Sequence, residues 1–214
     1  MISIQSISAL ILAYLMGSIP TAVWIGQAFY GVDVREYGSG NAGATNTFRV
    51  LGKKAGIPVM LIDILKGYGA TYLAHFIGIS TTGAIHSIDY TNYELALGIT
   101  AVMGHLFPIF AGFRGGKGVA TLFGMVLCVH IQAALLCICV FIVVLAITRF
   151  VSLSSILASF TYLIGVTFIF PSNKSVIIYG MCICVLILVT HQKNVERLLN
   201  GKESKVNLFK RKIA

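Results

Sequence analysis

Residues 119–147 read VATLFGMVLCVHIQAALLCICVFIVVLAI, a stretch of 29 residues without a charged side chain. One helix of this length would measure roughly 44 Å at 1.5 Å per residue, whereas the hydrocarbon core of a bilayer is about 30 Å thick. Two shorter helices that break near residues 130–132 would cross the bilayer twice, with some tilt or local thinning of the lipid. The division of this stretch therefore decides how many helices span the membrane.

The rest of the chain is similarly apolar. Of 214 residues 57% are hydrophobic and 11% are charged, and the mean hydropathy is +0.89, whereas soluble domains carry about 25% charged residues. Because backbone polar groups in hydrocarbon must be satisfied internally, long apolar runs indicate helices. Such runs lie approximately at residues 4–29, 55–79, 95–111, 119–147, 151–170 and 175–190. We predict an all-α, polytopic integral membrane protein, with residues 1–214 as a single membrane-embedded domain.

The basic residues predict the topology. They gather at 31–54, at 112–118 and in the tail from His191, whereas residues 80–94 contain no Lys or Arg. Cytoplasmic loops carry the excess of Lys and Arg, and all three basic segments lie inside if 119–147 crosses twice. This arrangement gives about seven transmembrane helices, with the N-terminus outside and the C-terminus cytoplasmic. Residues 1–32 are uncharged and lack a basic n-region or an Ala-x-Ala cleavage site, so we expect an uncleaved first span.

The net charge of +9 does not indicate nucleic-acid binding. The basic residues stand between or at the ends of apolar runs, where they meet anionic lipid headgroups. The five cysteines all lie inside apolar segments, which is typical of packing residues. We expect membrane lipids as neighbours, no nucleic acid, no cofactor and no metal; the sequence does not specify an oligomeric state.

A first candidate site is the loop YGSGNAGATN at 37–46, followed by Arg49. Its glycines formally match G-x-G-x-x-G, but no strand precedes them, so a dinucleotide fold is excluded. Glycines still let backbone N–H groups approach an anion, and an arginine fork suits phosphate oxygens. A plain turn is the alternative, but this loop of about 24 residues exceeds the usual two to eight. The expected donors are Ser39, Asn41, Thr45, Asn46 and Arg49.

A second candidate is GFRGGKG at 112–118. It fails as a Walker A loop because Ala111 replaces the first glycine and Gly118 replaces the Ser or Thr. A glycine nest and Lys117 at the start of a helix would still favour phosphate. The alternative is a basic turn rich in helix breakers. The preceding residues 105–108 are expected to shape the end of the previous helix.

A third candidate is THQKNVERLLNGKE at 190–203. If the last span continues as a helix, His191, Asn194 and Leu198 share one face, and Asn200-Gly201 stops it. The face would line a pocket or belong to an interfacial amphipathic helix. Within the second span Asp63 and Lys66 stand at i, i+3, either supporting the site or forming a purely structural ion pair.

Together the three segments resemble the signature motifs of the bacterial acyl-phosphate:glycerol-3-phosphate acyltransferases (the PlsY family). The resemblance rests on SGNAGATNTFR at 39–49, GGKGVAT at 115–121 and HQKNVERLLNGKE at 191–203. It implies acyl transfer from acyl phosphate to the 1-position of sn-glycerol 3-phosphate, giving lysophosphatidic acid and phosphate, the first acylation step of phospholipid synthesis. It also implies the bacterial cytoplasmic (inner) membrane, with the active site on the cytoplasmic side.

The resemblance further implies roles for individual residues. Lys117, Ser155, His191 and Asn194 would be catalytic, with Ser152 as the alternative to Ser155. The substrate-binding residues would be Ser39, Gly40, Asn41, Asn46, Arg49, Gly115, Gly116, Gly118 and Glu203.

The chemistry of the residues agrees with such a reaction. An acyl phosphate is already activated, which lessens the need for a covalent nucleophile, and no His here has an Asp five residues later. We therefore expect direct attack by the glycerol hydroxyl, oxyanion stabilisation by Lys117 and loop N–H groups, and proton transfer to a substrate phosphate oxygen. The alternative function is a transporter for an anionic phosphorylated metabolite, which predicts polar residues at the bilayer midplane and often an inverted repeat.

Overall fold

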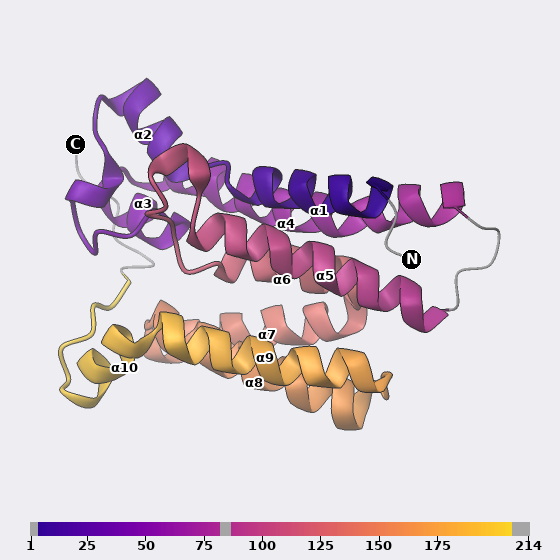
Figure 1. The fold of residues 1–214 in the computed structure, drawn as a ribbon. Coiled ribbons are helices and arrows are strands. Elements are labelled where there is room, and N and C mark those ends of the chain that lie inside the picture. Colours follow the sequence, from indigo (N-terminus) through magenta and orange to yellow (C-terminus); the bar gives the residue numbers. More distant parts are fainter. Residues whose placement is uncertain (1–3, 82–86, 207–214) are drawn as a thin grey trace. The chain divides into compact units, whose positions relative to one another are not determined.

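The computed structural model describes residues 4–81 and 87–206, and every regular element in these ranges is helical (Figure 1). The predicted all-α class is thus confirmed. The α-helices are α1 (Ile4–Gly17), α2 (Thr21–Tyr30), α3 (Ala44–Val50), α4 (Lys53–Thr81), α5 (Ser87–Leu106), α6 (Val119–Val129), α7 (Ile131–Thr148), α8 (Val151–Ile164), α9 (Lys174–Thr190) and α10 (Gln192–Leu199). Short 3-10 helices η1 (Val34–Glu36) and η2 (Ile109–Ala111) and a π-helical turn η3 (Gly165–Ile169) complete the list.

The chain divides into two compact units, Met1–Ile131 and Gln132–Ala214. The expectation of one continuous domain stays a prediction. In the first unit α1, α4, α5 and α6 pack side by side (Figure 1), and α3 packs on α4. In the second unit α8 packs against α9, and α10 contacts both.

Glycines allow a very close contact between α4 and α6 in the first unit. A Cβ added to Gly124 of α6 would collide with the Ile64 carbonyl oxygen of α4, and one added to Gly67 of α4 would collide with the Thr121 carbonyl oxygen. Helices in membranes associate through small residues that let the backbones approach, because lipid supplies no hydrophobic drive between them. The α4–α6 pair therefore depends on these two glycines.

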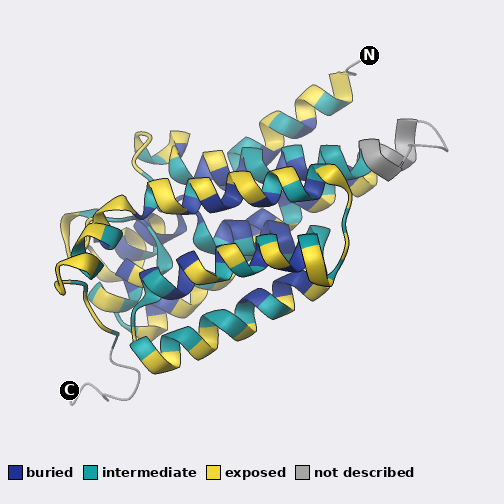
Figure 2. Ribbon diagram, turned by 90° about the horizontal axis from the view of Figure 1, so that it is seen from below, coloured by how far each residue is buried: buried dark blue, intermediate teal, exposed yellow. Residues whose placement is uncertain are grey.

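The outward faces of the helices are apolar. Along most helices buried residues alternate with exposed ones (Figure 2), and the exposed side chains include Leu65, Ile147 and Phe168. Among the described residues, three helical segments have the length and hydropathy of a membrane span: Tyr90–Ala111, Ile131–Thr148 and Val151–Ile169. Counting two bent helix pairs raises this number to five. The number of seven spans and their orientation stay predictions.

The stretch 119–147 breaks as expected. Helix α6 ends at Val129, His130 adopts φ −152° and ψ 84°, and α7 begins at Ile131. The break lies inside the predicted window. Helix α6 has 11 residues, about 16 Å at 1.5 Å per residue, which is close to half of the hydrocarbon core.

Three features of the chain path were not predicted. The first apolar run bends by 41° between α1 and α2, because Pro20 lacks an N–H group and restricts the residue before it. The loop 31–54 contains the helix α3, which carries Asn46 and Arg49. The last span does not continue straight through His191, since α9 and α10 meet there at 64°. The predicted stop is confirmed: α10 ends at Leu199 and Gly201 has φ +65°. The tail cations Lys210, Arg211 and Lys212 lie outside the described residues.

Candidate active site

The first loop is organised around the side chain of Asn46, which is 1% exposed. Its Oδ1 accepts hydrogen bonds from the Ser39 N–H at 2.8 Å and the Ser39 hydroxyl at 3.1 Å. Its Nδ2 donates to the carbonyls of Val34 at 2.7 Å and Tyr37 at 3.1 Å. A buried amide with all these contacts holds the loop closed. A direct phosphate contact would cost Asn46 one of them, so its geometry favours a supporting role.

The side chains that the loop presents outward are different ones. Ser39, Gly40 and Arg49 are exposed, and Asn41 is half-buried. Gly38 and Gly40 both have positive φ, +65° and +71°, a backbone conformation that glycine adopts without steric cost. The loop thus offers a hydroxyl, an amide and a guanidinium on one short segment.

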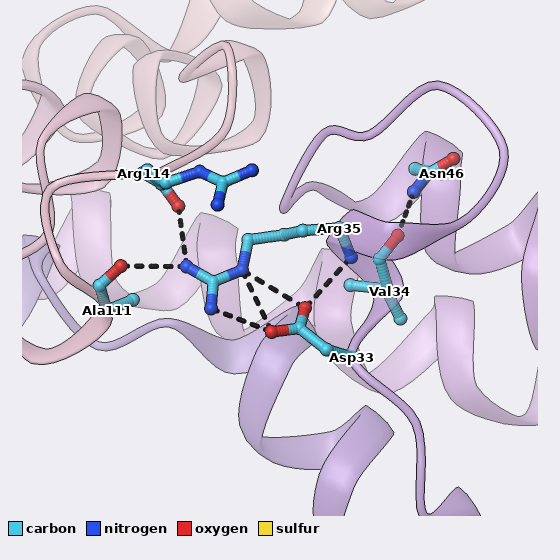
Figure 3. A network of polar contacts seen from close by, with 6 residues as sticks. All are labelled: Asp33, Val34, Arg35, Asn46, Ala111 and Arg114. Carbon is cyan, nitrogen blue, oxygen red and sulfur yellow. Dashed lines mark hydrogen bonds and ion pairs between the residues drawn. The ribbon is translucent and has the colours of Figure 1, made fainter.

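Arg35 joins this loop to the second one (Figure 3). Its Nη1 donates to the carbonyl oxygens of Ala111 at 2.7 Å and Arg114 at 3.4 Å. Its Nε and Nη2 donate to the Asp33 carboxylate, with Nη2 to Oδ2 at 2.7 Å. These hydrogen bonds lower the pKa of Asp33 and raise that of Arg35. The Ala42 N–H also donates to the Gly115 carbonyl at 3.4 Å, so the first and second motifs lie together.

The second loop is folded back on the end of α5. The Gly115 N–H donates to the Leu106 carbonyl at 3.2 Å and the Gly116 N–H donates to the His105 carbonyl at 3.1 Å. Residues 105 and 106 lie at the end of α5, as expected, and their carbonyls accept these hydrogen bonds from the turn. The turn itself therefore uses these two N–H groups.

The other end of the second loop opens a helix as predicted. Gly118 has φ +78° and stands at the N-cap of α6. The positive end of that helix dipole therefore lies beside Lys117, which is half-buried. Phe113 has φ +59°, which is unusual for an aromatic residue and costs of order 1 kcal/mol or more. The turn between η2 and α6 is thus held in one conformation against some backbone strain.

A buried polar cluster lies below the second loop. Lys66 and Asp63 form an ion pair, 2.8 Å between Nζ and Oδ1, and both side chains are nearly inaccessible. Lys66 also donates to the Ile19 carbonyl, and Thr21 donates to Asp63. The Nδ1 of His105 is 3.7 Å from the same carboxylate oxygen, and a Cβ at Gly116 would collide with the His105 ring. The cluster therefore reaches from the α1–α2 junction to the second loop.

In the second unit Glu203 accepts hydrogen bonds from three side chains. Its Oε1 accepts from the Asn194 Nδ2 at 2.6 Å and the Ser152 hydroxyl at 2.8 Å. Its Oε2 accepts from the Arg197 Nε at 2.7 Å. Burial alone would raise the pKa of Glu203, but the hydrogen bonds from Arg197, Asn194 and Ser152 outweigh it and lower that pKa. Glu203 is therefore an anion that fixes its neighbours.

The remaining predicted residues of this unit differ in their surroundings. His191 is buried and its Nδ1 is 2.9 Å from the Ile187 carbonyl, which favours the tautomer with the proton on Nδ1. The Ser155 hydroxyl donates to the Val151 carbonyl of its own helix at 2.9 Å. Of the two candidate serines, Ser152 is the one bonded to Glu203.

The structure thus brings the predicted residues together in two groups. The first unit holds those of motifs one and two, and the second unit holds Ser152, Ser155, His191, Asn194 and Glu203. Sequence reasoning had not selected Asp33, Arg35, His105 and Arg197, although an Asp-x-Arg pair beside a glycine loop was a visible signal. Within the described residues no three His, Cys, Asp or Glu side chains form an arrangement suited to a metal ion.

Comparison with known proteins decides the family. Residues 7–201 match the family model described as glycerol-3-phosphate acyltransferase. This chain belongs to the glycerol-3-phosphate acyltransferase family. A glycerol-3-phosphate acyltransferase of Listeria monocytogenes is 43% identical over 196 residues, covering 92% of this chain and 94% of the relative.

Two solved structures have the same fold. Both are PlsY, described as an integral membrane glycerol 3-phosphate acyltransferase, in a glycerol 3-phosphate form and a lysophosphatidic acid form. The TM-scores are 0.82 and 0.79 at 36% identity, each over 94% of this chain and over 96% and 95% of the respective structure. The resemblance inferred from the three motifs is confirmed. Motifs one and two lie within the matched residues, whereas Glu203 of motif three lies two residues beyond them.

Proposed function

We propose that this protein is a membrane acyltransferase that uses acyl phosphate to acylate the 1-position of sn-glycerol 3-phosphate. The products would be lysophosphatidic acid and inorganic phosphate, and the reaction would begin phospholipid synthesis. The family supports acyl transfer to glycerol 3-phosphate, and the lysophosphatidic acid form of a similar structure agrees with the product. Family and fold favour this enzyme over the anionic-metabolite transporter.

The observation that carries the proposal is that hydrogen bonds join the two glycine-rich loops of motifs one and two. The hydrogen bonds of Arg35 and Ala42 hold the Gly-Asn loop against the Gly-Gly-Lys-Gly loop. Arg49 from one loop and Lys117 from the other supply the positive charge that two phosphorylated substrates require. Ser39, Gly40 and Asn41 would hold one phosphate, with Asn46 keeping that loop in shape. Gly115, Gly116 and Gly118 would shape the turn that presents Lys117 to the acyl-phosphate head.

The proposed chemistry is a direct displacement. The 1-hydroxyl oxygen of glycerol 3-phosphate attacks the acyl carbonyl carbon, and the bond from that carbon to the phosphate oxygen breaks with its electron pair leaving on phosphate. The hydroxyl proton passes to a substrate phosphate oxygen. Lys117 would stabilise the negative charge that develops on the carbonyl and leaving oxygens, which is the part of such reactions most sensitive to a fixed cation. No cofactor is required by this balance.

The second unit would serve the same reaction. His191 and Asn194 are proposed as catalytic side chains, and Glu203 would orient Asn194 and Ser152. Because Ser152 rather than Ser155 is bonded to Glu203, we propose Ser152 as the site serine. Residues 1–214 would then act as one functional domain.

For the membrane arrangement we propose seven crossings in the bacterial cytoplasmic membrane, the N-terminus outside and the active site on the cytoplasmic side. The basic segments favour this orientation. In a variant without the five native cysteines, cysteines introduced at positions 41, 117 and 194 should all react with a membrane-impermeant maleimide only from the cytoplasmic side. Labelling of any of the three from outside would contradict the arrangement.

The enzyme assay combines the purified protein in detergent with palmitoyl phosphate and labelled glycerol 3-phosphate. We expect labelled lysophosphatidate, with one phosphate released per product molecule. No product should form when palmitoyl-CoA or palmitoyl-acyl carrier protein replaces palmitoyl phosphate. Lys117→Ala should lose about 10²-fold or more in kcat, as removal of an oxyanion-stabilising group does, without loss of folding. Covalent acyl-enzyme trapped with palmitoyl phosphate alone would refute direct attack, and activity only with acyl-CoA would refute the donor.

A further inference from the structure

We propose that Arg35 is a positioning residue that fixes the spacing of the two substrate loops and thereby the distance between the two reacting molecules. This inference rests on the proposed function, in which the loop of residues 37–46 and the loop of residues 112–118 hold different substrates. Arg35 lies in the short helix η1 just before the first loop, and its guanidinium ends at the second loop (Figure 3).

The side chain is anchored at both ends. On one side the Arg35 Nε donates to both carboxylate oxygens of Asp33, at 3.0 and 3.1 Å, and the Nη2 donates to Oδ2 at 2.7 Å. The Asp33 Oδ1 also accepts the Arg35 backbone N–H at 2.9 Å, which caps η1. On the other side Nη1 reaches the carbonyls of Ala111 and Arg114. A planar guanidinium held by a carboxylate in this fork geometry has little rotational freedom left.

These bonds leave Arg35 little capacity for a substrate. A guanidinium carries five N–H donors, and Nε, one hydrogen of Nη2 and both hydrogens of Nη1 can be assigned to protein oxygens. The side chain is 17% exposed, whereas Arg49 of the same segment is exposed. The two arginines therefore differ in function: Arg49 is available to a phosphate, and Arg35 is committed to the fold.

Arg35 makes a shorter hydrogen bond to the second segment than the backbone bond that also joins the two loops. The backbone bond from Ala42 to Gly115 is long, at 3.4 Å, whereas Arg35 reaches Ala111 at 2.7 Å with a charged donor. Ala111 and Arg114 stand directly before the Gly-Gly-Lys-Gly turn, so a shift of their carbonyls would move Lys117. A misplacement of about 1 Å between reacting groups can cost about 10²-fold in rate.

Steady-state kinetics of Arg35→Gln, with Lys53→Gln as matched control, test the inference. Lys53 is an exposed cation at the start of α4. Both substitutions therefore remove one positive charge, but only Arg35→Gln removes the hydrogen bonds between the loops. For Arg35→Gln we expect kcat to fall about 10²-fold, with KM for both substrates within about threefold. Lys53→Gln should match the wild type. Arg35→Lys, which keeps the charge but lacks the fork, should fall between them.

Hydrogen exchange gives a readout that does not depend on activity. Backbone amides of residues 111–118 should exchange about tenfold faster in Arg35→Gln than in Lys53→Gln, since local opening becomes easier when a tie is lost. Should Arg35→Gln not fold, Asp33→Asn and Arg35→Lys take its place under the same criteria.

Several results would overturn the inference. One is a kcat of Arg35→Gln within about threefold of Lys53→Gln. Another is a rise of KM for a single substrate at unchanged kcat, which would make Arg35 a direct ligand. Unchanged hydrogen exchange of residues 111–118 would show that Arg35 does not hold the two loops together. If the wild type is inactive with acyl phosphate, the proposed function fails together with the kinetic role, and exchange still shows whether Arg35 joins the loops.

Discussion

Replacing Glu203 with Gln tests the organisation of the second unit most directly. The carboxylate accepts from Asn194, Ser152 and Arg197 at 2.6 to 2.8 Å, and its side chain is 7% exposed. A glutamine has one oxygen and one NH2 group, so it cannot accept from all three. Either Arg197 faces an NH2 group, or Asn194 must turn its amide around.

The cost can be worked out bond by bond. A hydrogen bond to a charged partner contributes about 1.5 to 3 kcal/mol and a neutral one about 0.5 to 1.5, so the bonds to Ser152 and Asn194 lose about 1 kcal/mol each. Arg197 is 41% exposed, and solvent screening leaves its bond about 0.5 to 1 kcal/mol. The sum is about 2 to 3 kcal/mol, which corresponds to about 30- to 150-fold in kcat/KM if it is lost in the transition state.

The assay is the initial rate of lysophosphatidate formation, with the unfolding temperature of each variant measured in the same detergent. Glu196→Gln is the matched control, because Glu196 is an exposed carboxylate of helix α10, which directly precedes the segment of Glu203. We expect Glu203→Gln to lose about 30-fold or more relative to the control. A kcat/KM within about threefold of Glu196→Gln would refute the view that Glu203 orients the catalytic side chains.

The lowered pKa of Glu203 gives the same prediction a pH dependence. A carboxyl group whose folded pKa lies below its unfolded value, about 4.3, contributes stability above that value and loses it as pH falls through the folded pKa. Glu203 should therefore cause no loss of activity between pH 8 and pH 5. A fall in the wild type with a midpoint near pH 6 that is absent from Glu203→Gln would contradict this.

The other predictions concern a serine, an ion pair and a helix contact. Ser152→Ala should lower kcat for lysophosphatidate formation about tenfold or more, whereas Ser155→Ala should change kcat by less than about threefold. The reverse order would make Ser155 the site serine. Asp63→Asn should destabilise the protein by about 3 to 5 kcal/mol because it leaves the Lys66 ammonium buried without its carboxylate. The double variant Asp63→Leu with Lys66→Met should recover most of the unfolding temperature and the activity if the pair is purely structural. Gly124→Ala should lower the unfolding temperature because its Cβ meets the α4 backbone. Gly69→Ala should not lower it, since that Cβ meets only the flexible end of Met16. Equal unfolding temperatures of the two variants would contradict the close α4–α6 packing.

Much of the fold could be predicted from hydropathy and a few turn signals. The all-α class, the break at His130, the helix start at Gly118 and the stop at Asn200-Gly201 were all predicted. Each depends on a local cause, such as a long apolar run, a glycine with positive φ or an asparagine at a helix end.

The features that the sequence did not predict have a different physical origin. Helix α3 is seven residues long and contains two threonines, and a segment so short has no usable periodicity and poor intrinsic helix propensity. It forms because Asn46 and Thr47 are buried within the first unit. The bend at His191 likewise depends on tertiary contacts, since Asn194 of α10 bonds to Glu203 nine residues later. Tertiary contacts of this kind leave no pattern in a local window of sequence.

The same distinction explains why the motifs named the candidate residues but not their roles. Within motif one, Ser39 and Arg49 face outward while Asn46 is buried behind them. In motif three Asn194 is held by Glu203, which in turn is held by Arg197. A polar residue that holds a loop and one that contacts a substrate have the same side-chain chemistry, so a sequence pattern cannot separate them. Burial and the number of committed donors do separate them: a side chain whose hydrogen bonds are already made inside the fold must break one to bind a ligand. On that criterion Asn46, Arg35 and Glu203 support the site, and substitutions there should lower kcat more than they raise KM.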